Sequence, residues 1–209
     1  MSRSLLQKMK PYYIRKALRY LKHYGPKDFL IRVRERLTPD DVPYGPWYEK
    51  HRASQEELDR QRRECAAMPV RETPLFSVVV PAWKTPRVYL TGLLDCVLGQ
   101  TYPYLELVIA NASPEDEEMA KILEEYGRRD SRLTVVDLPE NESIAANTNA
   151  AIDKASGEFI CFMDHDDLIA PDALYEASKA AMRPDIDLIY TDEDKIRDDT
   201  KGGLEHFQP

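Results

Sequence analysis

The sequence has no long apolar run, and this argues against one large class of protein. Among its 209 residues, no stretch approaches the roughly 20 apolar residues that a membrane-spanning helix needs. The first ten residues, Met1–Lys10, contain basic side chains but neither the apolar core nor the small-residue cleavage site of a signal peptide. With 43% hydrophobic and 32% charged residues, the chain is expected to be a soluble globular protein without a leader sequence.

Cysteine, histidine and glycine-rich phosphate loops are also scarce or missing. The three cysteines are far apart and odd in number, so we expect buried free thiols in a reducing cytosol rather than disulfides. The four histidines show no zinc-ligand spacing. Neither G-x-x-x-x-G-K-[ST] nor G-x-G-x-x-G after the first apolar run occurs, which argues against a P-loop and a Rossmann dinucleotide site. No Ser-His-Asp or Cys-His arrangement points to a hydrolase.

Charge is divided unequally along the chain. Through Leu37 there are 11 Lys and Arg against 2 Asp and Glu, whereas the remainder holds 18 basic and 35 acidic residues. A basic arm on an acidic body suggests that the arm binds an anionic membrane surface or an acidic partner. We do not expect nucleic acid as a partner, because the acidic body would repel a phosphate backbone. The expected location is the cytoplasm, with peripheral contact at the inner face of the membrane.

The first 72 residues are expected to form a small, basic, helical extension, because strand-like runs are missing and three helical patterns fit them. The first pattern, Tyr13–Leu21, is interrupted at Gly25-Pro26, and the second covers Phe29–Leu37. Residues Pro39–Tyr48 are expected to form an irregular link. The third pattern, Ser54–Glu64, opens with a capping box. Packing on the protein's own domain is favoured for the second and third helices, while for the first helix packing and membrane binding stay equally open.

From Phe76 onward the pattern changes to apolar, β-branched runs that alternate with helical segments. Such continuous apolar strands predict an α/β fold with a mostly parallel sheet that helices cover on both faces. The predicted strands are Phe76–Val80, Leu105–Ala110, Leu133–Val136, Phe159–Met163 and Leu188–Tyr190. The predicted helices are Val88–Leu98, Glu115–Arg128, Ile144–Ala155 and Asp172–Ala181.

Three carboxylates directly follow the fourth predicted strand, which should be buried. In open α/β sheets, ligands bind at the carboxyl ends of the strands. If the chain stays extended there, Asp164 and Asp166 project to one side. Two hard oxygen ligands suit Mg²⁺ or Mn²⁺, which would stabilise a diphosphate as it leaves. The alternative is that these acids are solvated and that Asp167 or Asp172 caps the next helix.

With these residues identified, the segment 76–209 resembles the family 2 glycosyltransferases of the GT-A fold, whose Rossmann-like half binds a nucleotide-sugar. It is most similar to bacterial, rhamnosyltransferase-like members that build surface polysaccharides. Five of the family's motifs occur in order. They are Pro81-Ala82-Trp83-Lys84 for P-T-Y-N, Gln100-Thr101-Tyr102-Pro103 for Q-T-Y-P, Gly157 to Asp167 for G-E-Y-I-x-F-L-D-x-D-D, Pro171 and Leu174 for P-x-x-L, and Tyr190 to Lys195 for Y-[ST]-D-E-D-K.

The resemblance implies a role for each matching position. Pro81, Ala82 and Trp83 would frame the nucleotide base. Asp164 would contact the ribose or the metal, and Asp166 would ligate Mn²⁺ or Mg²⁺ between the phosphates. The site expected to bind the nucleotide-sugar further includes Asn111, Asn141, Thr148, His165 and Asp192. For the run that begins at Asp192, a purely structural role in the loop backbone stays open.

Some matching positions depart from the family pattern. The acidic residue that the family places against the base is Asn111 here, which can still donate and accept hydrogen bonds. The glycine of N-x-G, which allows a close backbone approach, becomes Ser143 after Asn141. Thr148 stands where many members have a phosphate-facing arginine, so more of the charge neutralisation is left to the metal.

The resemblance also bears on what the segment lacks. Family members continue past the stretch that matches His206–Pro209 into an acceptor-binding half, which carries the carboxylate base of the inverting reaction. No residue of this sequence is a convincing base. We therefore expect the base beyond Pro209 and regard residues 73–209 as a truncated donor-binding part.

Two functional hypotheses follow from different classes of protein. The first is an inverting glycosyltransferase that binds a UDP- or dTDP-sugar through a divalent metal. In the intact protein it would transfer the sugar to a glycan or lipid-linked acceptor during surface polysaccharide synthesis. The second is a non-catalytic nucleotide-sugar-binding or scaffold module with a degenerate site, whose basic arm docks to a membrane or a partner. A metal-dependent phosphotransferase ranks last.

Overall fold

The computed structural model describes residues 19, 21, 25–27, 44–69, 73–198 and 204–208. The chain divides into two compact units, one made of residues 1–52 and 192–209 and the other of residues 53–191. The predicted helices before residue 38 lie almost wholly outside the described residues. Gly25, which is described, has a φ of 83°, in the left-handed region that favours glycine.

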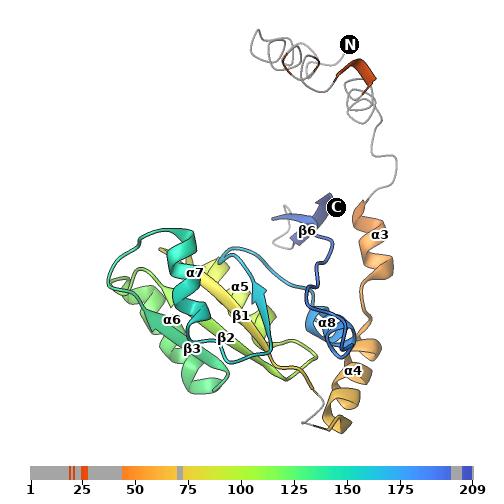
Figure 1. The fold of residues 1–209 in the computed structure, drawn as a ribbon, viewed down its shortest axis with the longest axis horizontal. Coiled ribbons are helices and arrows are strands. Elements are labelled where there is room, and N and C mark those ends of the chain that lie inside the picture. The colour runs from red at the N-terminus through yellow and green to blue at the C-terminus, as the bar shows by residue number, and fades with distance from the viewer. Residues whose placement is uncertain are drawn as a thin grey trace. The chain divides into compact units, whose positions relative to one another are not determined.

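The unit of residues 53–191 is built on a four-stranded, all-parallel sheet (Figure 1). Its order is β3-β2-β1-β4, so the chain first builds outward from β1 in one direction and then returns to the other side of β1. Each strand was expected within one or two residues of its observed bounds. The strands are β1 Phe76–Ala82, β2 Leu105–Asn111, β3 Leu133–Asp137 and β4 Phe159–Phe162.

The helices of this unit also match the expected pattern. Ser54 caps α4, where its hydroxyl accepts the Glu57 N–H, as the capping box predicts. Asp116 caps α6, and it accepts the N–H groups of Glu118 and Met119. The helices are α4 Gln55–Ala67, α5 Arg87–Leu98, α6 Glu117–Arg129, α7 Ile144–Ile152 and α8 Ala173–Ala181.

Apolar side chains alternate along β1 and fill two core layers, one on each face of the sheet. Val78 and Val80 face a large cluster with residues of α5, α6 and α8, and Cys65 of α4 belongs to the same cluster. Val79 faces a smaller cluster that includes Ala151 of α7. Helices therefore cover both faces of a parallel sheet, and the α/β expectation is confirmed.

Two expectations about the strands are wrong. Residues 188–190 form no strand, and Leu188 and Tyr190 are 81% and 89% exposed. An apolar, β-branched run becomes a strand only where a neighbour accepts its hydrogen bonds, and the described sheet offers these residues none. The burial predicted for residues 159–163 is confirmed for Met163, which is 6% exposed, but is wrong for β4 itself, which pairs with β1 alone and leaves Phe162 68% exposed.

The third N-terminal helix, α4, packs on the sheet unit, as the preferred interpretation predicted. Thr101 donates to Gln61 Oε1 at 2.8 Å, and Tyr175 donates to Glu64 Oε2 at 2.5 Å. The bond to Glu64 is the main reason why the pKa of Tyr175 is raised to about 12. Arg60 pairs with Glu57 and Glu64 on the solvent side of the helix.

The amino end of the sheet is closed by a compact polar cluster. Ser77 of β1 donates to Glu106 Oε1 at 2.6 Å and accepts the Gly157 N–H at 2.8 Å. Ser156 gives both its N–H and its hydroxyl to Glu106. Burial acts to raise the pKa of Glu106, but the bonds from Ser77, Ser156 and Gly157 outweigh it and leave the pKa below its ordinary value.

The other unit contains α3 Tyr44–His51 and an antiparallel pair, β5 Lys195–Asp198 with β6 Leu204–Gln208. The irregular link predicted around Pro46 is thus wrong, since Pro46 falls in the first helical turn, where its missing N–H costs nothing. Tyr44 donates to Asp194 Oδ2 at 3.1 Å, and its pKa is raised, first by burial and then by this bond. No described helix is both long and apolar enough to span a bilayer.

Gly157→Ala should destabilise the fold. A Cβ at this position would lie 2.5 Å from Ser77 Oγ and 2.7 Å from the Leu75 carbonyl oxygen. We expect the free energy of unfolding in urea to fall by about 1–3 kcal/mol. Gly127→Ala in α6 is the matched control, because a Cβ there meets nothing within 4 Å and should stabilise the helix by about 0.5–1 kcal/mol. Equal losses in both variants would contradict the steric explanation.

Glu106→Gln should destabilise the protein in a pH-dependent way. Because the folded pKa of Glu106 lies below its ordinary value of 4.5, the ionised form contributes stability above that value and loses it as the pH falls through the folded pKa. The difference in unfolding free energy between wild type and variant should therefore be largest near neutrality and shrink in acid. Urea titrations at several pH values measure it, and a pH-independent difference would refute the assignment.

Candidate functional site at the switch point of the sheet

The strand order reverses between β1 and β4, and the candidate site lies where these two strands end. β1 continues through β2 to β3 on one side, whereas β4 lies on its other side. Met163 N–H still donates to the Val79 carbonyl, at 3.3 Å. Continued by two more pairs, the β1–β4 register sets Asp164 level with Pro81. In open α/β sheets this crevice is the usual ligand site.

The acidic run that leaves β4 forms a tight turn, which we call the acidic turn (residues 164–167). Asp167 N–H donates to the Asp164 carbonyl at 3.3 Å, so the extended conformation expected here is wrong. Asp164 and Asp166 are exposed, and no hydrogen bond or ion pair to a described residue engages either side-chain carboxylate. The turn replaces the alternation of a strand but still leaves both carboxylates at the carboxyl end of the sheet.

The chemistry of this turn fits a hard divalent cation. Carboxylate oxygens that are close in sequence and lack a Lys or Arg partner repel one another until a cation neutralises them. His165 Nδ1, between them, is buried and has no hydrogen-bond partner among the described residues. No three His, Cys, Asp or Glu side chains of the described chain converge on one ion. Asp164 and Asp166 could thus be two ligands of a shell that other oxygen atoms complete.

The end of β1 presents an aromatic ring and a strained lysine beside this turn. Pro81 and Ala82 complete the strand, while the Trp83 ring is 48% exposed. Lys84 has a φ of 47° and is the only described non-glycine residue with a positive φ. A left-handed conformation costs an L-residue about 1–2 kcal/mol, so neighbouring groups must hold it. Thr85 Oγ1, next in the chain, is buried without a partner among described residues.

Asn111, which was expected to contact the nucleotide base, forms hydrogen bonds within the protein. It is 1% exposed, its Nδ2 donates to Asp137 Oδ1 at 2.8 Å, and its Oδ1 accepts the Ser113 N–H at 3.1 Å. These contacts position the ends of β2 and β3. Asp137, level with Asn111 in the sheet register, is the exposed polar group at this point. A base contact by Asn111 itself stays a prediction.

The remaining predicted site residues lie on other elements. Asn141, in the loop before α7, accepts a bond from Asn147 Nδ2 at 2.8 Å. Thr148 Oγ1 donates to the Ile144 carbonyl of its own helix at 2.7 Å, so its hydroxyl is already in use. Asp192 belongs to the unit of residues 1–52 and 192–209, which is described apart from the sheet. Their roles in binding stay predictions.

Gln100 stabilises the segment that follows the acidic turn, and the motif that contains it had suggested no role for it. Its Nε2 donates to the carbonyls of Cys96 and Ala170, at 3.0 and 2.7 Å, and its Oε1 accepts the Leu174 N–H at 3.0 Å. It thereby ties the end of α5 to the start of α8, immediately after the loop that carries the turn. Its presence in an intact Q-T-Y-P motif was the available signal.

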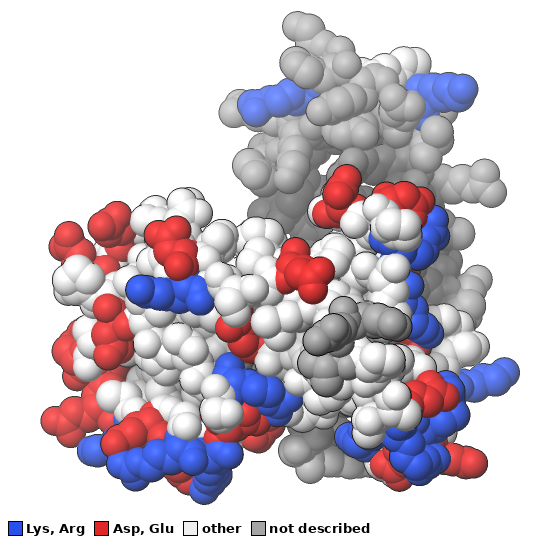
Figure 2. All heavy atoms as spheres, turned by 60° about the horizontal axis from the view of Figure 1, so that its bottom comes forward, with Lys and Arg blue, Asp and Glu red and all other residues white. Residues whose placement is uncertain are grey.

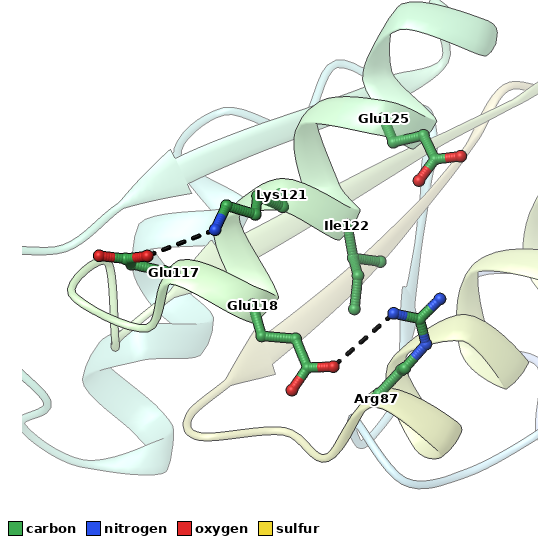
Figure 3. A pocket seen from close by; sticks show the side chains of 6 residues that line it. All are labelled: Arg87, Glu117, Glu118, Lys121, Ile122 and Glu125. Carbon is green, nitrogen blue, oxygen red and sulfur yellow. Dashed lines mark hydrogen bonds and ion pairs between the residues drawn. The ribbon is translucent and has the colours of Figure 1, made fainter.

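A groove of about 350 Å³ lies apart from these residues, between the first turns of α5 and α6 (Figure 3). The charged side chains that line it pair with each other, Arg87 with Glu118 at 3.7 Å and Lys121 with Glu117 at 3.3 Å. It contains none of the predicted site residues. Figure 2 shows acidic and basic side chains side by side along the bottom of this face, while acidic ones predominate at its left. We therefore regard the groove as ordinary helix surface.

Comparison with known proteins agrees with this geometry. The model of glycosyl transferase family 2 matches residues 77–206. The uncharacterized protein y4gI of Sinorhizobium fredii is 38% identical over 140 residues, which is 65% of this chain and 15% of that protein. The O-antigen biosynthesis protein RfbC of Myxococcus xanthus is 27% identical over 175 residues, which is 83% of this chain and 14% of its own.

A solved structure with a similar sequence is the mannosyltransferase PcManGT from Pyrobaculum calidifontis in complex with GDP-Man and Mn²⁺. It is 25% identical, with a TM-score of 0.47 over 61% of this chain and 39% of its own.

A parallel α/β sheet with helices on both faces defines the class as an α/β protein, and its candidate site lies at the switch point of the sheet. Since the family model matches more than half of the residues, the chain belongs to glycosyl transferase family 2. The sheet with helices on both faces agrees with the GT-A fold expected from the motifs. The chain spans only 15% and 14% of the length of the two curated relatives.

Gln100→Leu tests the support of the segment that follows the acidic turn. The variant keeps the side-chain volume but leaves the Leu174 N–H without its partner, and a buried group of this kind costs about 1–3 kcal/mol; the Ala170 carbonyl still accepts the Ala173 N–H. Thermal and urea unfolding should show a loss of roughly 1–3 kcal/mol. Gln55→Leu on the exposed side of α4 removes one surface bond, to Asp59, and should change stability by less than about 0.5 kcal/mol. A Gln100 variant as stable as this control would contradict the bridging role.

Proposed function

We propose that this chain is the donor-binding part of a glycosyltransferase that takes a nucleotide-diphospho-sugar. The observation that carries the proposal is the acidic turn at the switch point of the sheet, whose two exposed carboxylates, Asp164 and Asp166, form no ion pair with a described residue. Membership of glycosyl transferase family 2 supports a sugar-transfer reaction. The diphosphate is the anionic part of such a donor. To bind beside the acidic turn, at the carboxyl end of the sheet, it needs a positive charge there.

Mn²⁺ or Mg²⁺ bound by Asp164 and Asp166 would supply that positive charge. Both ions bind carboxylate oxygens and complete their shell with phosphate oxygens and water. When bound, the ion would neutralise the charge that develops on the departing nucleoside diphosphate. The residues of the chain hold the ion and orient the donor, and His165 lines the turn between the two ligands.

The base of a UDP- or dTDP-sugar would lie against the end of β1. Pro81 and Ala82 set the backbone there, and the half-exposed Trp83 ring offers an aromatic surface on which a base can stack. Asn111 would act through Asp137, to which it is bonded, as well as by the direct contact expected from the motif. Asn141 and Thr148 complete the proposed donor site on the pattern of the resemblance, and a binding role for Asp192 stays a prediction of that pattern.

For the intact protein we propose inverting transfer to a glycan or lipid-linked acceptor in surface polysaccharide synthesis. The name of the O-antigen biosynthesis protein RfbC supports this acceptor class. We further propose a cytoplasmic location with peripheral membrane contact, supported by the 11 basic and 2 acidic residues through Leu37. The proposal assigns no described residue to deprotonation of the acceptor.

Asp166→Asn tests the metal-dependent donor site. Calorimetric titration of UDP and dTDP should show binding in Mn²⁺ that a chelator weakens strongly. In Mn²⁺ the variant should bind at least about tenfold more weakly than wild type, equivalent to roughly 1.4 kcal/mol. The amide keeps the shape of the side chain but lacks the charge that an ion requires.

Asp153→Asn, on an exposed residue after α7, is the control for a lost surface carboxylate and should bind as wild type does. Tight nucleotide binding that survives the chelator would refute the metal role. If no nucleotide binds with any divalent ion, the non-catalytic scaffold is favoured instead. The scaffold hypothesis is supported by Asn111, because both polar atoms of its side chain form hydrogen bonds within the protein.

A further inference from the structure

Lys84 is the only basic residue in the four segments that connect a strand of the sheet to the following helix. These segments span residues 83–86, 112–116, 138–143 and 163–172, and all of them are described. They carry eight acidic residues: Glu115, Asp116, Glu140, Glu142, Asp164, Asp166, Asp167 and Asp172. The side chain of Lys84 is therefore a single positive charge at a carboxyl end of the sheet that is otherwise acidic. It lies two residues after β1, and β1 pairs with β4, the strand that leads into the acidic turn.

A hydrogen bond to a buried residue holds the backbone of Lys84 in its left-handed conformation. Its N–H donates to Ser113 Oγ at 2.9 Å, and Ser113 is fully buried. Ser113 is in turn fixed by Asn111, whose Oδ1 accepts the Ser113 N–H at 3.1 Å. The Ala112 N–H also donates to the Ala82 carbonyl, at 2.8 Å, which joins the two loops. Such strain at a non-glycine residue persists where surrounding contacts over-determine it, and it is common at ligand sites.

The side chain of Lys84 is exposed but does not pair with a carboxylate. Its Nζ lies 5.3 Å from the centroid of the Trp83 ring, and no described Asp or Glu forms an ion pair with it. Arg87, three residues further along, does pair with Glu118. The cation–π contact thus keeps the ammonium group beside the aromatic surface while leaving its charge uncompensated.

We propose that Lys84 binds the phosphate oxygens of a nucleoside diphosphate directly, opposite the side held by the acidic turn. This inference rests on the proposed donor site and adds to it a phosphate ligand that needs no metal. The two strands that meet at the switch point then act on the same diphosphate in different ways. The acidic turn attracts it only through a divalent ion, whereas Lys84 supplies a positive charge of its own.

A specific reason favours Lys84 over Thr148 for this task. The Thr148 hydroxyl is committed to the Ile144 carbonyl of α7 and carries no charge. Lys84 has three N–H donors, and no carboxylate of the described residues forms an ion pair with it. A charge-assisted bond of this kind changes affinity by about 10- to 100-fold.

The test is calorimetric titration of UDP and dTDP against the whole chain in Mn²⁺ and, separately, in excess chelator. Lys84→Met should weaken nucleotide binding in Mn²⁺ by about 10- to 100-fold. It should also abolish the residual binding that remains in chelator. The wild-type affinity should fall more steeply with added NaCl than that of the variant, because one phosphate contact is lost.

Three further variants separate charge from structure. Lys84→Arg keeps the charge and should retain most of the affinity. Lys84→Gly relieves the left-handed strain and should unfold no more easily than wild type, yet lose as much affinity as Lys84→Met. Lys154→Met removes another exposed lysine, after α7, and should bind normally. If Lys84→Gly binds as wild type does, the charge has no role and the inference is overturned.

The outcomes also distinguish this inference from the function on which it rests. If wild type binds UDP or dTDP in Mn²⁺ and Lys84→Met binds equally well, only the role of Lys84 fails. If wild type binds neither nucleotide, with or without Mn²⁺, the donor site fails and Lys84 fails with it. Loss of binding in Lys84→Met with an unchanged salt dependence would indicate a lost packing contact and would also overturn the phosphate role.

Discussion

The parallel pairing of β1 with strands on both of its sides is the constraint on which the rest of this structure depends. β2 pairs along the whole of β1, and β4 pairs along its first four residues. Because both neighbours are parallel, the loops after β1, β2 and β4 leave the sheet at the same edge. This brings Trp83 and Lys84 beside the acidic turn, although about 80 residues separate them in the chain.

The polar side chains at the two ends of the sheet differ in whether they have hydrogen-bond partners. At the amino end, Ser77, Glu106 and Ser156 satisfy one another within a few ångströms. At the carboxyl end, the carboxylates of Asp164 and Asp166, the ammonium group of Lys84 and Nδ1 of His165 have no polar partner among the described residues. A closed cluster fixes strand positions and adds stability, whereas open groups cost stability unless a ligand completes them. This contrast places the chemistry at one end of the sheet.

Most of the sheet could be predicted from the sequence, because its signal is local. Apolar runs bounded by polar segments fixed β1 to β4, and the capping box at Ser54 fixed the start of α4. The strand predicted at Leu188–Tyr190 was wrong because an apolar run says nothing about whether a neighbouring strand is available. The irregular link predicted where α3 forms was wrong because proline was taken as a helix breaker, although it is tolerated in the first turn of a helix.

The candidate site was predictable in composition but not in conformation. The acidic residues after β4 were identifiable from their position behind an apolar run. The turn that they form is closed by a backbone bond from Asp167 to Asp164, whereas the left-handed Lys84 backbone and the bond from Asn111 to Asp137 join segments far apart in the chain. Such bonds leave no periodic trace in a single sequence.

The contacts of α4 bear on where this protein can be divided. Gln61 accepts a bond from Thr101, and Glu64 accepts one from Tyr175, while Cys65 is fully buried in the main core. A fragment that began after residue 72 would keep every strand and every residue of the acidic turn. It would nevertheless uncover the core at Cys65 and leave the buried Thr101 hydroxyl facing nothing, next to the residue that stabilises the segment after the acidic turn. For expression and crystallisation, α4 therefore belongs with the sheet.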